Sequence, residues 1–353
     1  MPQDEMTSKQ RWLAVLNGEP TDRVPTDYWA TEEATAKLKQ YLGYQTFEEV
    51  AQALHIDQVL AVDPEYVGPE LAEGEDEFGC RFQQMDYGTG DYSEIGHNPL
   101  ADFGSVAEIE RHYRWPEPDW WDYSHLPGQV AGKEDYPIDA FGSEPFNRYC
   151  KLRGLQQGFM DLLLNPEMVH YCLDILFELA YQNTRRIYEA IPGQVVYSYV
   201  AEDLGSQEDL LFSRDQILEF FIPGMKRMID LAHEHGVYVF HHSDGAIREI
   251  LPDMIEAGID VLNPVQWRCK GMDRAALKRD FGDQIVFHGA MDNQYTLAFG
   301  TVDEVRQEVI DNLQILGDGG GYILAPCHNI QAISPPENIV AMYETAYEHS
   351  RNA

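Results

Sequence analysis

Polar side chains able to carry acid–base or metal chemistry follow several apolar runs of this sequence. In Val237–Leu251 the apolar run stops at the stretch HHSDG, which begins at His241. Other runs end in a comparable way, at Asp63, at Glu202 and Asp203, at Asn263 and Gln266, at His288 and Asp292, and at Cys327, His328 and Asn329. One such residue alone is more often a helix cap or a buried structural group than a catalyst. Their recurrence predicts one active site, if the runs are parallel strands that end at a common edge.

A metal site is one chemistry that these residues can supply. Strict strand alternation places His241 and Ser243 on the same face of their strand, and it allows Cys327 on the last strand to point to the same interior. Imidazole, thiolate and carboxylate groups are zinc ligands, whereas the neutral hydroxyl of Ser243 is a poor one. The predicted metal ligands are therefore His241, Asp244 and Cys327.

The other polar residues at the run ends suit proton transfer and substrate binding. Carboxylates and imidazoles are the usual general acids and bases of enzymes. The predicted catalytic residues are Asp63, Glu202, Asp203, His241, Asp244 and His288. The predicted substrate-binding residues are Tyr199, Gln207, Asn263, Gln266, Asp292 and Asn329.

Alternating strands and helices must position these residues. From Gln194 onward, five apolar strands each precede a helical segment. About three looser units come before them, and the first is a short strand at Arg23–Ala30 followed by a helix from about Glu32 to Leu42. Eight such units predict an α/β fold, a (β/α)8 TIM barrel whose active site lies at the carboxyl ends of the strands. No glycine-rich phosphate loop follows a strand, which disfavours an open doubly wound sheet with a nucleotide cofactor. We expect a single domain over residues 1–353, with residues 73–136 as an inserted elaboration that contains a hairpin.

The composition limits the partners. Sixty acidic residues against 25 basic ones give a formal net charge of −35, which argues against nucleic acid and anionic membranes. Five scattered cysteines without a CxxC pair predict no disulfide framework and favour the cytoplasm. No stretch approaches the roughly 20 apolar residues of a membrane span. A cytoplasmic protein with a small-molecule substrate is expected, and the oligomeric state is left open.

Four blocks of the chain resemble the uroporphyrinogen decarboxylase superfamily. They begin at Ala201 (AEDLGSQEDLLFSRDQ), at His241 (HHSDGAIREILPDMIEAGIDVLNPVQ), at Phe287 (FHGAMDNQYTLAFGT) and at Gly320 (GGYILAPCHNIQAISPPENI). The resemblance implies a (β/α)8 barrel with its cleft at the carboxyl ends of the strands. The superfamily contains the haem-pathway decarboxylase and a branch of cobamide-dependent methyltransferases.

The residues that match each branch differ. The decarboxylase has an arginine-containing segment that grips the carboxylates of a tetrapyrrole, and the corresponding stretch here, DYWATEEATAKL, has no arginine. Asp63 resembles the catalytic aspartate of that enzyme. The methyltransferase branch binds zinc through a His-x-Cys pair and a later cysteine; His241 keeps the histidine, Ser243 replaces the first cysteine, and Cys327 lies near the last. Asp244 or His242 can complete a different site, harder than a thiolate site.

The resemblance therefore implies a methyltransferase that acts on a small polar or methylated substrate. Zinc is the expected metal, and a corrinoid protein or cofactor is the expected methyl carrier. Two alternatives stay open. One is a metal-free decarboxylase of the uroporphyrinogen decarboxylase type, and the other is a non-catalytic protein that binds a corrinoid or tetrapyrrole.

Overall fold

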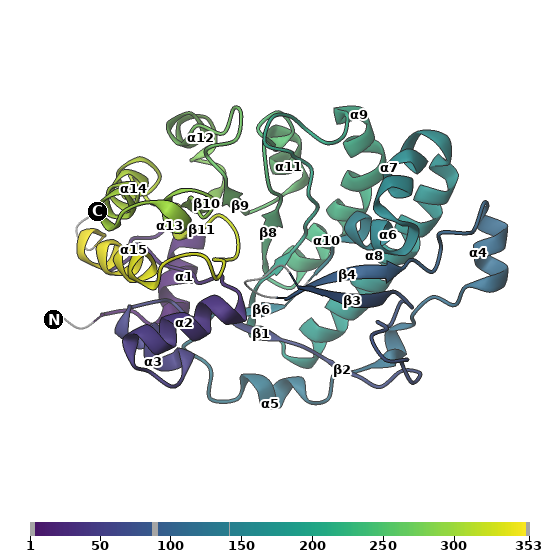
Figure 1. The fold of residues 1–353 in the computed structure, drawn as a ribbon, viewed down its shortest axis with the longest axis horizontal. Coiled ribbons are helices and arrows are strands. Elements are labelled where there is room, and N and C mark those ends of the chain that lie inside the picture. The colour runs from purple at the N-terminus through teal and green to yellow at the C-terminus, as the bar shows by residue number, and fades with distance from the viewer. Residues whose placement is uncertain (1–3, 87–90, 141, 351–353) are drawn as a thin grey trace.

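Seven parallel strands form the central sheet of the chain. The computed structural model describes residues 4–86, 91–140 and 142–350 (Figure 1). The strand order is β1-β6-β7-β8-β9-β10-β11, and every neighbouring pair is parallel. The strands are β1 (Leu60–Val62), β6 (Ile138–Ala140), β7 (Val195–Tyr199), β8 (Tyr238–His242), β9 (Val261–Val265), β10 (Val286–Met291) and β11 (Tyr322–Pro326).

Helices follow the strands along the chain, as the sequence predicts for β/α units. After β6 come α6 (Pro145–Arg153), α7 (Leu155–Leu164) and α8 (Pro166–Ala190). After β7 come α9 (Arg214–Gln216), a π-helical turn (Ile217–Phe221) and α10 (Ile222–Glu234). The later strands are followed by α11 (Leu251–Ala257), α12 (Arg274–Phe281), α13 (Thr296–Phe299) with α14 (Val302–Ile315), and α15 (Pro336–His349).

Two further parts of the chain stand outside these units. The N-terminal part contains α1 (Ser8–Leu16), α2 (Glu32–Leu42) and α3 (Phe47–Ala53). Between β1 and β6 lie β2 (Glu65–Tyr66), β3 (Arg81–Asp86), β4 (Asp91–His97), α4 (Val106–His112), a 3-10 turn (Pro118–Trp120), β5 (Trp121–Asp122) and α5 (Leu126–Val130). The pairs β2–β5 and β3–β4 are small antiparallel sheets.

The expected first strand, residues 23–30, is not a regular strand. It meets β11 through two isolated parallel bridges, Thr26 with Leu324 and Ala30 with Ile330. Proline at position 25 has no N–H to donate, but its carbonyl accepts from the Leu324 N–H at 2.9 Å. The observed sheet is thus a seven-stranded curled sheet with an irregular segment along its β11 edge.

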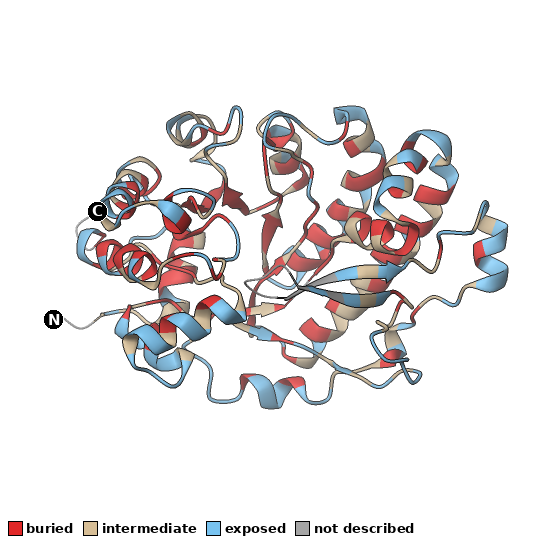
Figure 2. Ribbon diagram, in the orientation of Figure 1, coloured by how far each residue is buried: buried red, intermediate tan, exposed pale blue. Residues whose placement is uncertain are grey.

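The two faces of the sheet belong to different buried clusters. One cluster joins Trp12 of α1 to inward residues of the strands, and the Trp12 ring stacks on Tyr197 and Phe240 at 5.4 and 5.8 Å. The other cluster joins the opposite faces of the strands to the surrounding helices and includes Val239. Strands β9, β10 and β11 of the central sheet are buried at every residue, whereas β1 is partly exposed (Figure 2). Because Phe240 faces the interior of the curled sheet, the alternation of β8 places His242 there as well.

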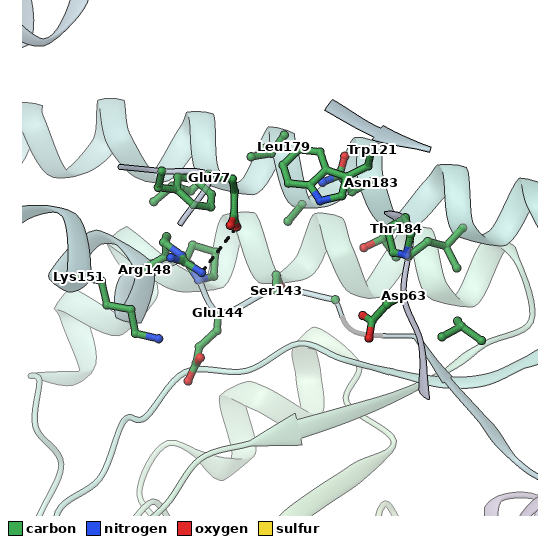
Figure 3. A pocket seen from close by; sticks show the side chains of 18 residues that line it. Asp63, Glu77, Trp121, Ser143, Glu144, Arg148, Lys151, Leu179, Asn183 and Thr184 are labelled. Carbon is green, nitrogen blue, oxygen red and sulfur yellow. Dashed lines mark ion pairs between the residues drawn. The ribbon is translucent and has the colours of Figure 1, made fainter. Parts of the chain in front are cut away.

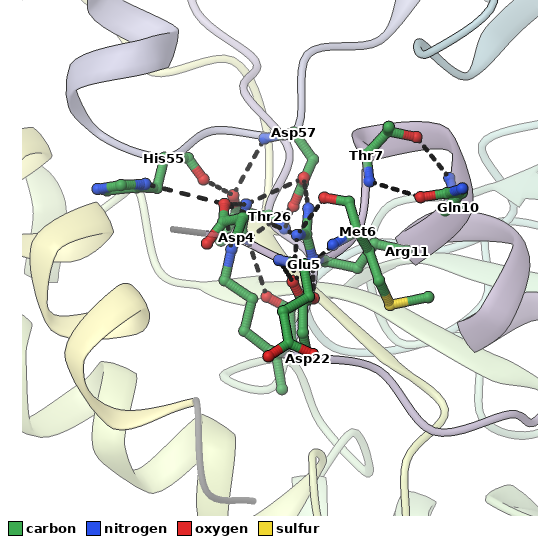
Figure 4. A network of polar contacts seen from close by, with 12 residues as sticks. Asp4, Glu5, Met6, Thr7, Gln10, Arg11, Asp22, Thr26, His55 and Asp57 are labelled. Atoms are coloured by element: carbon green, nitrogen blue, oxygen red, sulfur yellow. Dashed lines mark hydrogen bonds and ion pairs between the residues drawn. The ribbon is translucent and has the colours of Figure 1, made fainter. Parts of the chain in front are cut away.

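A buried ionic network ties the N-terminal segments together (Figure 4). The Asp57 carboxylate accepts from Arg11, from both terminal nitrogens of Arg23 at 2.8 and 3.0 Å, and from the Thr26 N–H at 3.0 Å. Asp22 pairs with Arg11. Burial alone would raise the pKa of Asp22, but the hydrogen bond and charge of Arg11 lower it to about 2. The network fixes the segment at residues 23–30 against the loop that leads into β1.

No helix among the described residues is long and apolar enough to cross a membrane.

Candidate functional site

A histidine and two carboxylates come together at the carboxyl ends of β7 and β8. Asp203, His242 and Asp244 each offer a ligand atom, and these atoms lie within 4.8 Å of one another. His242 Nε2 lies 4.0 Å from Asp203 Oδ1, which also accepts from the Asp244 N–H at 3.1 Å. His242 and Asp244 are two positions apart, as are His241 and Ser243, the pair that the sequence placed on one strand face. The observed pair lies one residue further along the chain.

A chain of hydrogen bonds fixes the tautomer of His242. His242 Nδ1 lies 2.6 Å from Asn263 Oδ1, an oxygen that can only accept, so Nδ1 carries the proton. The Asn263 Nδ2 amide donates to His288 Nδ1 at 2.6 Å, and His288 Nε2 donates to Asp27 Oδ2 at 3.1 Å. His242 Nε2 is therefore left with a free lone pair beside Asp203 and Asp244. This is the tautomer of a histidine that binds a metal through Nε2.

Asp244 lies in a partly enclosed position. Among the described atoms its Oδ1 is buried without a hydrogen-bond partner. Burial raises the pKa of Asp244 and the charge of Asp203 adds to this, while His242, His328 and a hydrogen bond from Gln266 oppose the shift. An orphaned carboxylate oxygen beside an imidazole lone pair creates a place for a cation.

Backbone packing holds the two loops of this site together. A Cβ on Gly205 would lie 2.7 Å from the Asp244 carbonyl oxygen and 2.8 Å from the Ala246 nitrogen, so only glycine allows this approach. The Ala246 N–H donates to the Ser206 carbonyl at 2.7 Å, and the Gly245 N–H donates to Gln266 Oε1 at 2.7 Å. Gln266, expected to bind substrate, therefore supports the loop that carries Asp244.

His241 and Ser243 lie on the helix side of β8, whereas the sequence suggested that His241 faces the interior. His241 Nδ1 lies 2.7 Å from the Val200 carbonyl oxygen, and its Nε2 is buried without a partner among the described residues. Burial lowers the pKa of His241 to about 4, so the ring is neutral at pH 7. The Ser243 hydroxyl accepts from the Leu204 N–H at 3.0 Å. Both side chains connect β8 to the segment that follows β7.

Cys327 is also directed away from the interior. Its thiol donates to the Val265 carbonyl oxygen at 3.2 Å. Burial raises the pKa of this thiol well above its usual value, and the charges of Glu308 and Asp292 add to the shift. Among the described residues, the predicted ligands His241, Asp244 and Cys327 do not form a group with adjacent ligand atoms. The alternation does not extend to Cys327 because β11 ends at Pro326, so this residue lies outside the regular strand.

Glu202 and Asp292 bind backbone N–H groups. The buried Glu202 carboxylate accepts from the N–H groups of Phe146 and Asn147 in the first turn of α6. Burial nevertheless raises its pKa well above the usual range. Asp292 accepts from Arg268 Nε at 2.6 Å and from the Thr296 N–H at 3.1 Å. The structure thus places both residues at strand ends, where they stabilise the starts of helices or turns.

The interior of the sheet contains a cavity of about 340 Å³ above the Trp12 layer. Of the predicted substrate-binding residues, Tyr199 and Asn329 line it. Asp27, Trp29 and Asp139, which are not among the predicted site residues, line it too. Trp29 joins the cavity to the histidine site, because its ring lies 5.8 Å from those of His242 and His288. The position of Asp139 within the otherwise apolar stretch YPIDAFG is the one feature of the sequence that indicates an unusual role for this residue.

Asp63 belongs to a second cavity, of about 440 Å³, beside the ends of β1 and β6 (Figure 3). Arg148 and Lys151 of α6 line this cavity, and so does Ser143. Gln207, the remaining predicted residue, lies on the exposed loop after β7, where its amide donates to Gln294 Oε1 at 3.3 Å. Asp63 and Gln207 are therefore not part of the group around His242.

Comparisons with known proteins identify the family of the chain. The profile of the uroporphyrinogen decarboxylase family matches residues 129–349. A methylcobamide:CoM methyltransferase from Methanosarcina barkeri is 24% identical over 362 residues, which cover 98% of this chain and 99% of the relative. A uroporphyrinogen decarboxylase from Neisseria meningitidis serogroup C is 27% identical over 336 residues, which cover 91% of this chain and 84% of the relative.

A solved methyltransferase structure from Methanosarcina mazei has the same fold. It superposes with a TM-score of 0.67 at 21% identity, over 98% of this chain and 99% of that one. The family profile covers more than half of the chain, and the similarity to the methyltransferases extends over nearly its whole length. The chain is therefore a member of the uroporphyrinogen decarboxylase family, closer to the methyltransferase branch than to the haem-pathway decarboxylases.

Proposed function

We propose that this protein is a cytoplasmic methyltransferase that acts on a small polar or methylated substrate. A divalent cation held by Asp203, His242 and Asp244 assists it, and a corrinoid protein carries the methyl group. The observation that carries the proposal is the free lone pair of His242 Nε2 directed toward two carboxylates.

The donor set fits a divalent cation. One neutral imidazole and two carboxylates are ligand types found in zinc sites, and they are harder than a set that contains thiolates. A bound cation would lower the pKa of a coordinated thiol or hydroxyl group. The site is thus suited to the activation of an acceptor at neutral pH.

The protein's own residues position these groups. The hydrogen bonds from Asp27 through His288 and Asn263 hold the His242 ring in one orientation and one tautomer. Such partners of a ligand typically contribute about 10–100-fold in metal affinity or activity. Trp29 and the interior cavity next to His242 would bind the substrate's apolar part and exclude water.

The remaining features of the fold fit the same proposal. We infer that the segment at residues 23–30 takes the place of an eighth strand, since it bridges β11 and is bound to Asp57 near β1. Residues 73–136 would then be an elaboration of one barrel domain, inserted between β1 and β6.

A methyl-transfer assay tests the proposed function against decarboxylation. The purified protein is supplied with zinc, methylcobalamin and a thiol acceptor, and the loss of the methylcobalamin absorbance is followed. We expect methyl transfer that needs both the protein and the metal. A haem-pathway decarboxylase must bind many carboxylates, and no Lys or Arg is among the described residues that line the interior cavity. Release of carbon dioxide from uroporphyrinogen, without any methyl transfer, would overturn the proposal.

A further inference from the structure

The interior cavity combines aromatic walls with acidic groups. Its described lining contains five aromatic side chains, two carboxyl groups and two amides: Tyr28, Trp29, Phe47, Tyr197, Tyr199, Asp27, Asp139, Gln58 and Asn329. None of the described lining residues is basic. Aromatic faces attract cations through their quadrupoles, and aromatic cages are a recurrent way to bind quaternary ammonium groups. The lining therefore favours a cationic ligand with apolar substituents.

The two carboxyl groups of the cavity, Asp27 and Asp139, differ in their hydrogen bonds. Asp27 Oδ2 accepts from His288 Nε2 at 3.1 Å and from Trp29 Nε1 at 2.9 Å, and Asp27 Oδ1 accepts from the Tyr28 N–H at 2.8 Å. Asp139, by contrast, has a buried Oδ1 without any hydrogen-bond partner among the described residues. A buried polar atom without a partner is costly unless a ligand or a proton satisfies it. Asp139 is thus the acid of the cavity that is available to a ligand.

Asp139 reaches the cavity because of its place in the sheet. Its neighbours Ile138 and Ala140 on β6 belong to the cluster shared with the helices, so the alternation turns Asp139 inward. It pairs in register with Tyr197 on β7 and with Ala61 on β1. The side chain therefore lies beside the aromatic wall.

We propose that this cavity binds the alkylated ammonium group of the substrate, with Asp139 as its counter-ion and Trp29 and Tyr199 as cage walls. The proposal names a substrate class for the methyltransferase function proposed above and rests on that function. The net charge of −35 supports it, because the field of the whole protein concentrates small cations near the molecule.

The charges around Asp139 explain why a cation is preferred. The groups that act on it are the carboxylates of Asp27 and Asp63, and it lies beside the phenols of Tyr197 and Tyr199. Burial, followed by the charges of Asp27 and Asp63, raises the pKa of Asp139 to about 8. At pH 7 the Asp139 carboxyl group of the free protein is therefore mostly protonated. A bound ammonium group would stabilise the carboxylate form in place of this proton. A cation that binds there must displace this proton.

Calorimetry with a matched pair of probes tests the proposal on the full chain. The cation is choline, and its control is the neutral carbon isostere in which a tert-butyl group replaces the trimethylammonium head. We expect choline to bind at least about tenfold more tightly, because a desolvated cation–π contact contributes about that factor. Titrations at pH 7 in buffers of different ionisation enthalpy should also show that choline binding releases protons. The isostere should release none.

Two variants separate Asp139 from the net charge of the protein. Asp139→Asn should weaken choline binding at least about tenfold, because the buried ammonium group loses its counter-charge. The variant should also abolish proton release and leave isostere binding within about twofold. Asp174→Asn removes an exposed carboxylate on α8 and should leave both ligands unaffected. Equal affinity of wild-type protein for the two probes would overturn the proposal, and so would choline binding unchanged in Asp139→Asn. If Asp139→Asn does not fold, the comparison of choline with its isostere on the wild-type protein still tests the proposal.

The binding measurement and the methyl-transfer assay test the two proposals separately. Choline binding with proton release, but without methyl transfer under any condition, would contradict the proposed function and leave the cation site in place. Methyl transfer without choline binding would retain the methyltransferase and contradict the cation site.

Discussion

Replacing His242 by alanine is expected to remove the bound metal and to lower methyl transfer by at least about a hundredfold. Partners that merely orient a metal ligand contribute about 10–100-fold, and His242 is the ligand itself. Without its Nε2 lone pair, Asp203 and Asp244 would be left as two neighbouring carboxylates that repel each other. Elemental analysis and the methylcobalamin assay on the same preparation measure both effects.

Two variants serve as controls for His242→Ala. Cys327→Ser changes a thiol that points to the Val265 carbonyl, so metal content and activity should stay within about twofold of wild type. His241→Ala removes a buried ring on the helix side of β8, so it should lower thermal stability while the folded fraction retains its metal. Loss of metal in Cys327→Ser, with full metal in His242→Ala, would restore the ligand set expected from the sequence.

Asp57→Asn is expected to have the largest effect on stability. The buried carboxylate pairs with both Arg11 and Arg23 (Figure 4). Its removal would leave these guanidinium groups with only the less buried Asp22 and Asp4 as counter-charges. Breaking a buried ion pair by removing one partner typically costs about 3–5 kcal/mol. Urea unfolding of the purified variant should therefore show a much lower midpoint.

The matched control for Asp57→Asn is Asp119→Asn. Asp119 pairs with Arg186 at 2.8 Å, but its side chain is 83% exposed, and exposed pairs contribute about 0–1 kcal/mol. Equal unfolding midpoints for the two variants would show that the network of Asp57 does not stabilise the fold.

Local sequence signals predicted much of the helical structure. Thr46 and Glu49 have the residue types and the spacing that predict a capping box, and the structure forms it, with the Glu49 N–H donating to the Thr46 hydroxyl at 3.2 Å. The helix expected at residues 32–42 is α2. These features depend on residues within one or two turns of each other, which is why the sequence alone is sufficient to predict them.

The directions of the site residues could not be predicted in the same way. Strand β8 is buried on both faces, with Val239 on one and Phe240 on the other, so its hydrophobic pattern does not reveal which face is the interior. The sequence therefore assigned His241 to the interior, where the structure places His242. Alternation also could not place Cys327, because this residue follows Pro326, the last residue of β11, and alternation holds only within a strand.

Contacts between distant segments account for the residues that sequence analysis missed. Asp27 and Asp139 are far apart in the chain and meet only because the segment at residues 23–30 and β6 face the same cavity. The link from Asp27 to His288 spans 261 positions. No local pattern carries such information, although the acid of β6 within an apolar run indicated an unusual environment.

A zinc titration of the chelator-treated, full-length protein tests the central claim most directly. We predict one zinc ion per chain, with an affinity that falls as the pH is lowered, since protons compete for His242 and the two carboxylates. The same titration on His242→Ala should show no comparable binding. A protein that binds no zinc at neutral pH, or that binds it with equal affinity after His242→Ala, would contradict the proposed metal site.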